Sequence, residues 1–519
     1  MEKNTAIPKL TGQRFEQDMP ELSINEETVL ENFMKLNINK SSGPDKIPAI
    51  LLKQTAEAFK TPLSLLFSRS YNEGKIPSIL KNANVTPLFK GGKSKTPNNF
   101  RPISLTSVIA KVMERIFKKT LVKFIEENDI ISNKQHGFRP GRSTSSNLIA
   151  TWEKITDWAD ENKGVSIIYT DFRKAFDNVP KELLLMKLEH YGVRGKNLQW
   201  LNDFLTDRSQ QVVLNGKTSR TKEIKTACPQ GGVLSGILFS LYINDLPDVI
   251  KKCEITLYAD DAKIFAPITG EDSIKEVQED IDNLVNWNTD WRQDLSIKKC
   301  HHIDYLPKKY ANLTPEYKIS GMTIERKSKT TDLGITISED LKFHAQVDKV
   351  KRLATLEINR MRRSFTSRNP KFVRNAYKTY IRPNMEYCVE LWNPQYKGDI
   401  IKLEKVQNKI TKLMNYGNTM SPAERNKRMK LTTHEQRRQR GDMITIFKNR
   451  NNLELFPTKM DSRTRTNSKA IAIRGVRTNI KKHCISHRNV SMWNQLPEEI
   501  VTAPNVQTFK RRYDKHVKI

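Results

Sequence analysis

The chain has 519 residues, enough for about two to four packed units, and its 89 Lys and Arg against 58 Asp and Glu give a net charge of +31 at pH 7. This excess is far larger than solubility requires, and it favours a polyanionic partner, nucleic acid first, over a merely solvated basic surface. Five scattered cysteines without a CxxC pair exclude a disulfide framework, and the absence of a signal peptide or of roughly 18 consecutive apolar residues leads us to expect a soluble, intracellular protein.

In chain order, the N-terminal part is predicted to be helical around a single strand. Residues 1–25 lack periodicity and are interpreted as a leader or linker. The first helix begins near Glu26 and ends before the turn at 41–45, because apolar residues recur at helical spacing up to that Ser-Ser-Gly-Pro-Asp sequence. The next predicted elements are a helix over 47–71, a strand over 84–89, the basic glycine-rich loop 90–93 and an amphipathic helix over 107–127.

One apolar strand and two predicted hairpins mark the middle of the chain. The strand over 164–170 runs directly into Asp171. The turn Asn215-Gly216 is a strong hairpin signal, and a second hairpin carries Ala259-Asp260-Asp261 at its tip. The other predicted elements are helices over 183–206 and 233–246, a mostly helical stretch from about 312 to 416, and basic helices over 421–519. Because strands and helices alternate without a strict βαβ period, the predicted fold class is α+β.

Three aspartates at strand ends are candidate metal ligands. Two-metal phosphoryl transfer needs carboxylates that converge on cations about 3.5–4 Å apart, and Asp171 and Asp260 are the candidates to bridge both ions. Asp261 adds a third negative group, and three clustered carboxylates repel one another without cations. An Asp-Asp pair alone is more typical of an ordinary solvated turn than of a metal site, so the surrounding motifs must decide.

Ordered sequence blocks surround these aspartates. The nearest are DFRKAFD at 171–177, PQGGVL at 229–234 and YADD at 258–261. The others are GPDKIP at 43–48, RPISL at 101–105, QHGFRPGRST at 135–144, LGI at 333–335, RPNMEY at 382–387 and MWNQLP at 492–497. Together they resemble the reverse transcriptases of non-LTR (LINE, Jockey-like) retrotransposons. The resemblance implies an RNA-directed DNA polymerase with a right-hand architecture: fingers, an antiparallel palm sheet and a thumb.

The resemblance also implies roles for the residues of the catalytic centre. Asp171, Asp260 and Asp261 correspond to the metal-binding triad, in agreement with their placement at strand ends. Phe176 matches the aromatic gate that fills the space of a ribose 2′-hydroxyl and thereby selects deoxynucleotides. The alternative for Phe176 is a plain core aromatic. The implied cofactor is a pair of Mg²⁺ ions, with Mn²⁺ as an alternative.

Further residues match substrate-side positions of the family. Arg101 resembles the fingers arginine that closes on the triphosphate, a task suited to a rigid, permanently charged fork. Lys299 lies where the family often carries a lysine able to protonate pyrophosphate, and the alternative is an exposed lysine. The remaining substrate-side candidates are Gln230 and Gly231 in the loop against the incoming nucleotide, Tyr258 beside the aspartates, and Lys90 or Lys93, between which the spacing does not decide.

Departures from the family keep other functions open. Gly232, Ser235 and Gly236 stand where the family more often has Ser, Gly and Pro, and glycine at 236 is expected to loosen the start of a helix. Full-length elements usually carry an endonuclease ahead of the polymerase, and residues 1–25 are too short to hold one. The alternative function is therefore a non-catalytic nucleic-acid-binding remnant of a truncated retroelement. A viral RNA-dependent RNA polymerase is a third option. An intact triad and gate favour retained chemistry.

The resemblance divides the chain into four parts: a leader or linker at 1–25, fingers and palm at 26–311, a primer-grip and thumb-like helical region at 312–420, and a basic nucleic-acid-binding region at 421–519. The last 119 positions, from Ile401, hold 27 basic and 9 acidic residues, a composition suited to phosphate contacts. The expected partners are template RNA, primer or target DNA and dNTPs, without a membrane. We expect the protein in a cytoplasmic ribonucleoprotein, in the nucleus, or in both; the oligomeric state stays open.

Overall fold

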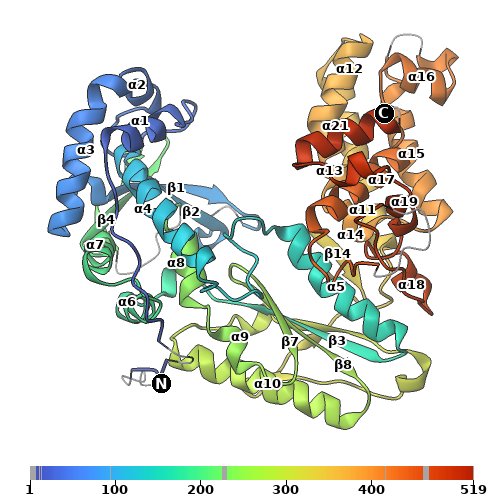
Figure 1. Cartoon of the computed structure of the whole chain (residues 1–519), viewed down its shortest axis with the longest axis horizontal. Helices are drawn as coiled ribbons and strands as arrows, with labels where there is room; N and C mark the ends of the chain where they lie inside the picture. The colour runs from blue at the N-terminus through green and yellow to red at the C-terminus, as the bar shows by residue number, and fades with distance from the viewer. Residues whose placement is uncertain are drawn as a thin grey trace.

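The computed structural model describes residues 7–10, 12, 14–93, 95–224, 231–414, 417–459 and 467–517. Its parts form a U, with an N-terminal lobe and a C-terminal helical lobe standing at opposite ends of a central sheet layer (Figure 1). The two lobes therefore face each other across the sheet. Within the described ranges, no helix combines the length and the apolar content that a membrane span requires.

The base of the U is a five-stranded sheet in the order β12-β9-β3-β8-β7. Its strands are β3 (Gly164–Asp171), β7 (Glu254–Tyr258), β8 (Asp261–Ile268), β9 (His301–Tyr305) and β12 (Glu325–Arg326). Neighbours are antiparallel except β12, which runs parallel to β9. Because side chains alternate along a strand, Ile168 joins the core shared with the N-terminal lobe, whereas Ile167 joins the core beneath the C-terminal helices.

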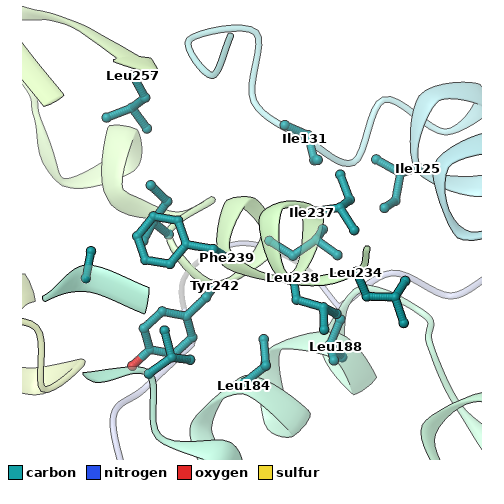
Figure 2. Packing of buried hydrophobic residues seen from close by; sticks show 14 of the residues in the cluster. Ile125, Ile131, Leu184, Leu188, Leu234, Ile237, Leu238, Phe239, Tyr242 and Leu257 are labelled. Carbon is teal, nitrogen blue, oxygen red and sulfur yellow. The ribbon is translucent and has the colours of Figure 1, made fainter. Parts of the chain in front are cut away.

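Four helices surround this sheet: α5 (Thr144–Asp160), α8 (Ser235–Tyr242), α9 (Leu246–Val249) and α10 (Glu271–Asp290). Every residue of α8 is buried, and Figure 2 shows this helix at the centre of a cluster that includes Ile131 and Leu188. The predicted helix over 233–246 is thus shorter than expected. It ends at Tyr242, and Pro247 lies in the first turn of the separate helix α9, where its missing N–H costs no hydrogen bond.

The N-terminal lobe packs helices against a second sheet in the order β2-β1-β4-β5, with β6 beside β4. Its helices are α1 (Glu26–Met34), α2 (Ala49–Gln54), α3 (Ala56–Glu73), α4 (Val108–Glu127), α6 (Lys181–His190) and α7 (Gly195–Leu205). Its strands are β1 (Asn82–Phe89), β2 (Phe100–Thr106), β4 (Arg208–Leu214), β5 (Lys217–Thr218) and β6 (Lys222–Ile224). The predicted hairpin turn is confirmed, since Asn215 and Gly216 have φ of 50° and 76°.

Two predicted helices of this lobe are each broken once, and the expected leader is partly packed. The helix over 47–71 divides at Thr55, and the helix over 183–206 divides around Gly192. The backbone N–H of Met19 donates to the carbonyl of Gly192 at 2.8 Å, and the Met19 side chain is buried. A Cβ on Gly192 would lie 2.3 Å from the carbonyl oxygen of Gln17, so glycine permits this close approach. The segment around Met19 is therefore part of the fold rather than a free linker.

The stretch from 312 to 416 was expected to be mostly helical, but its first part consists of strands. These are β10 (Lys318–Ile319), β11 (Met322–Thr323), β12, β13 (Lys329–Asp332) and β14 (Ile335–Ser338). The predicted boundary between 311 and 312 therefore passes through the central sheet, because β12 pairs with β9. The helices of the lobe are α11 (His344–Ser364), α12 (Pro370–Ala376), α13 (Arg382–Glu386), α14 (Val389–Trp392) and α15 (Lys397–Thr411).

The C-terminal region packs on these helices instead of forming a separate unit. Its helices are α16 (Pro422–Arg428), α17 (His434–Asn449), α18 (Asn479–Lys482), α19 (Val490–Asn494), α20 (Glu498–Val501) and α21 (Val506–His516). Asp442 on α17 is buried and accepts hydrogen bonds from Arg488 Nε at 2.8 Å, Asn489 at 2.7 Å and Asn393 at 3.1 Å. Asn393 follows α14, so this network joins the two regions. A buried carboxylate satisfied in this way resists separation of its partners.

Candidate active site

The three predicted aspartates meet at one edge of the central sheet. Asp171 is the last residue of β3, Asp261 is the first residue of β8, and the two are direct partners in the antiparallel register. Directly opposed residues project to the same face, so this register places their side chains together. Asp260 lies between β7 and β8 in the connecting turn. The hairpin predicted around this turn is confirmed.

The charges of these aspartates perturb one another. Burial, followed by the charge of Asp171, raises the pKa of Asp260, while Arg101 and Lys299 oppose the rise. Burial, then Asp260, Asp332 and Asp171, raises the pKa of Asp261 to about 6. Neighbouring carboxylates thus make ionisation of Asp260 and Asp261 more costly, as expected for a group of acids that needs a cation.

The turn that carries Asp260 is braced by Gln135. Ala259 has φ of 56°, a left-handed conformation that is unfavourable for a residue with a Cβ. Gln135 is fully buried, and its Oε1 accepts the backbone N–H of Ala259 at 3.0 Å and that of Gly137 at 2.7 Å. A Cβ on Gly137 would lie 2.3 Å from the Ala259 nitrogen, so glycine is needed for this approach. The first residues of the QHGFRPGRST block therefore support the turn, a role that the sequence did not reveal.

Lys299 forms an ion pair with Asp171. Its Nζ lies 2.9 Å and 3.1 Å from the two Asp171 carboxylate oxygens, and its side chain is 66% exposed. The backbone N–H of Ser296 donates to the Asp171 carbonyl at 2.7 Å, which fixes the Lys299 segment beside β3. The structure thus brings Lys299 into the site. Its assignment as a proton donor stays a prediction.

Phe176 lies in an aromatic stack with Phe239 and Phe138. Its ring stacks on Phe239 at a centroid distance of 4.5 Å and meets Phe138 edge to face at 6.2 Å. A Cβ on Gly236 would lie 2.4 Å from Cδ1 of Phe138. Glycine at 236, where the family more often has proline, thus makes room for the Phe138 ring. Phe176 is only partly buried, so both its predicted role as a gate and core packing are compatible with its position.

The candidates for binding the nucleotide lie less close together than the three aspartates do. Arg101 is exposed on β2, and it is near enough for its charge to lower the pKa of Asp260. Lys90 and Lys93 lie in the exposed loop between β1 and β2, where Asn99 binds the backbone of both residues. These contacts leave both ammonium groups at the surface and do not distinguish between the two lysines.

Gly231 lies against β2. Gly231 has φ of 106°, and a Cβ there would lie 2.9 Å from the Ser104 carbonyl oxygen. Gln230 falls outside the described residues. Glu114 on α4 supports the segment that follows Gly231, because its buried carboxylate accepts the backbone N–H groups of Val233 at 2.7 Å and Leu234 at 3.3 Å. Glu114 was missed from the sequence, since an acid within an amphipathic helix carries no signal of this distant contact.

A pocket of about 170 Å³ opens between the aspartates and the β13–β14 hairpin. Tyr258, the register partner of Asp261, lines it. Other lining residues are Asp171, Asp261, Lys299, Asp332 and Leu333. Arg101 lowers the pKa of Asp260, whereas Asp332 raises and Lys263 lowers the pKa of Asp261, so the two adjacent aspartates have different charged neighbours.

Comparison with known proteins agrees with this geometry. Residues 90–337 match the family described as reverse transcriptase (RNA-dependent DNA polymerase). The chain is 24% identical over 412 residues to the probable RNA-directed DNA polymerase from transposon BS of Drosophila melanogaster, covering 76% of this chain and 45% of that protein. It is 26% identical over 417 residues to the RNA-directed DNA polymerase from mobile element jockey of the same species, covering 76% and 44%.

Residues 90–337 therefore form a reverse transcriptase domain with a polymerase fold of the α+β class. The chain is a homologue of the non-LTR retrotransposon polymerases of the BS, X-element and jockey type. It spans about 45% of the length of the BS and X-element relatives.

Reverse transcriptases in general use divalent metal ions, and the donors present here suit such an ion. Within the described residues, no group of three or more His, Cys, Asp and Glu side chains converges closely enough to hold a metal alone. Mg²⁺ commonly binds through one or two carboxylates and completes its shell with water and substrate phosphates. Asp171 with Asp261 or Asp260 therefore fits a site that is completed only when a nucleotide binds.

Proposed function

We propose that the chain is the RNA-directed DNA polymerase of a non-LTR retrotransposon, which adds dNTPs to a primer 3′-hydroxyl on an RNA template. The observation that carries the proposal is the direct pairing of Asp171 with Asp261 next to Asp260, inside a reverse transcriptase domain. Three acids lie at one sheet edge, and the charge of Asp171 raises the pKa of both Asp260 and Asp261, so the group is suited to binding the cations of nucleotidyl transfer.

We further propose that the three parts of the U correspond to a right hand. The N-terminal lobe with β1 and β2 is the fingers, the central sheet is the palm, and α11 to α15 form the thumb. The basic region from 421 holds template RNA or target DNA through phosphate contacts. The proposed location is a cytoplasmic ribonucleoprotein, the nucleus, or both.

In this mechanism Asp171, Asp260 and Asp261 would hold two Mg²⁺ ions, with Mn²⁺ as an alternative. Bound ions supply a lowered pKa for the primer 3′-hydroxyl and charge stabilisation for the leaving pyrophosphate. Arg101 binds the triphosphate from the fingers side, and Phe176 excludes the 2′-hydroxyl of a ribonucleotide. Lys299, which pairs with Asp171 at the edge of the site, would be placed to give a proton to the leaving pyrophosphate.

The alternative is a non-catalytic remnant that binds RNA without polymerising. The intact set of Asp171, Asp260, Asp261, Phe176 and Arg101 argues against it, because loss of selection would be expected to alter some of these positions.

Primer extension with the purified chain tests the proposal. We expect Mg²⁺-dependent extension of a DNA primer on an RNA template, with dNTPs preferred over rNTPs. Binding of the RNA without extension would support the remnant instead. A preference for rNTPs would contradict the assignment as a DNA polymerase. Asp272→Asn is the matched control for Asp260→Asn. It alters an aspartate whose side chain is 94% exposed, and it should leave extension unchanged.

A further inference from the structure

The turn between β13 and β14 has a conformation that its sequence does not favour. Leu333 and Gly334 have φ of 44° and 90°. Asn215 and Gly216, with φ of 50° and 76°, adopt the same kind of turn in the other hairpin. Two-residue turns of this kind prefer Asn-Gly because asparagine tolerates positive φ, whereas leucine does not. The Leu333-Gly334 turn therefore depends on support from outside the hairpin.

One support comes from the central sheet. Lys263 Nζ lies 2.7 Å from Asp332 Oδ2, and both side chains are almost fully buried. Thr330 on β13 is joined to His301 on β9, with 2.6 Å between the hydroxyl and Nε2. Lys263 is two residues beyond Asp261 on β8, so this pair fixes the base of the hairpin close to the catalytic aspartates.

The other support comes from the helical lobe and acts on the turn itself. The Tyr387 hydroxyl donates to the carbonyl of Leu333 at 2.9 Å. The Tyr387 ring lies close enough that a Cβ on Gly334 would be 3.2 Å from its Cε1. Lys349 on α11 donates to the Gly334 carbonyl at 3.0 Å. Both carbonyls of the unfavourable turn are thus held by residues of the proposed thumb.

We propose that Tyr387 is a positioning residue that couples the thumb to the primer 3′ end by holding the Leu333-Gly334 turn. This inference rests on the proposed function. Leu333 lines the same pocket as Asp171 and Asp261, so the turn faces the place where the primer terminus must lie for its 3′-hydroxyl to react. A thumb that moves away from the sheet releases the turn, and a released turn no longer presents the primer end to the aspartates.

The test uses the full chain with a DNA primer on an RNA template. Tyr387→Phe removes the hydroxyl and keeps the ring. We expect the KM for primer–template to rise about fivefold, the effect of one hydrogen bond, while the KM for dNTP and the melting temperature stay unchanged. Tyr380→Phe is the matched control, since Tyr380 is a neighbouring tyrosine with 60% of its surface exposed, and it should behave as wild type.

A rescue variant separates positioning from general damage. Leu333→Asn supplies a residue that favours the turn, and in the Tyr387→Phe background it should return the KM for primer–template close to wild type. Wild-type kinetics of Tyr387→Phe, equal effects on both KM values, or failure of the rescue would each overturn the inference. The fluorescence of 2-aminopurine at the primer 3′ end, measured without dNTPs, should differ between wild type and Tyr387→Phe. This signal tests the contact between the turn and the primer end even if the wild-type chain extends no primer. A wild-type chain that extends no primer would contradict the proposed function and not this inference.

Discussion

Gln135 and Ala259 are separated by 124 positions in the chain, yet Gln135 Oε1 accepts the Ala259 backbone N–H at 3.0 Å. Ala259 precedes the two adjacent aspartates and has a positive φ. A buried side chain that satisfies this N–H holds an unfavourable backbone conformation in place. The geometry of the candidate catalytic turn therefore depends on a residue that carries no charge and no chemistry of its own.

We expect Gln135→Met to reduce kcat for primer extension by about 10- to 100-fold. Methionine has a similar volume, but it leaves the buried N–H groups of Ala259 and Gly137 without an acceptor, at a cost of about 1–3 kcal/mol each. Steady-state kinetics and thermal melting check this together. Unchanged kcat in a folded Gln135→Met variant would show that the turn does not need the brace.

Phe176→Val is expected to admit ribonucleotides. The smaller side chain opens space beside Phe239 and Phe138, where the wild-type ring is stacked. The ratio of kcat/KM for dNTP to that for rNTP should fall by at least about tenfold, while dNTP incorporation persists. Phe372→Val is the comparison, because Phe372 is a partly buried phenylalanine that packs against the core of the helical lobe. An unchanged ratio in Phe176→Val would leave Phe176 as a core aromatic.

Gly236→Ala should alter nucleotide selection more than stability. The added Cβ would lie 2.4 Å from the Phe138 ring, which is 47% exposed and can turn towards solvent. The Phe138 ring then no longer packs edge to face against Phe176, so the proposed gate residue loses one of its packing contacts. We expect a fewfold lower discrimination against rNTPs. The double variant that combines Gly236→Ala and Phe138→Ala should discriminate against rNTPs as well as Phe138→Ala alone does. Fully additive effects of the two changes would contradict the coupling.

The raised pKa of Asp261 predicts a pH dependence of cation binding. Its pKa of about 6 exceeds its usual value of 3.8, so between these values the folded, metal-free protein binds more protons than the unfolded chain. The charge of Asp261 therefore destabilises the metal-free protein as pH rises through 6, and a cation offsets this effect. The Mg²⁺ concentration that half-activates extension should rise by up to about tenfold per unit as pH falls below 6. A midpoint that stays constant from pH 5 to 8 would contradict this prediction.

The main parts of the candidate site could be predicted because their signals are local. An apolar strand that ends in Asp171 and a hairpin tip that holds Asp260 and Asp261 can be recognised within a few residues, and the register then places them together. Gln135 and Glu114 could not be found in this way. Their contacts span more than a hundred residues, and a buried polar side chain looks in sequence like any exposed one.

The fold shows the same division. Long periodic helices such as α4 were predicted, whereas β10 to β14 were missed, because strands of two to four residues carry too few positions for an alternating pattern. The Leu333-Gly334 turn also lacks the Asn-Gly signal that marked the hairpin at Asn215. The docked segment around Met19 was missed because its extended backbone has no periodicity and is held by contacts to α6, to the loop that follows it and to Asn197 of α7.

The most direct test of the account is the Mg²⁺-dependent extension rate of Asp260→Asn on an RNA template, measured beside Asp261→Asn. Both aspartates feel the charge of Asp171, but Asp260 is also influenced by Arg101, which is proposed to bind the triphosphate, whereas Asp261 lines the pocket beside the β13–β14 hairpin. The melting curve should show that Asp260→Asn is folded. We expect the extension rate of Asp260→Asn to fall at least about a thousandfold, and that of Asp261→Asn to fall less. A wild-type rate in Asp260→Asn would contradict the assignment of this turn as the catalytic centre.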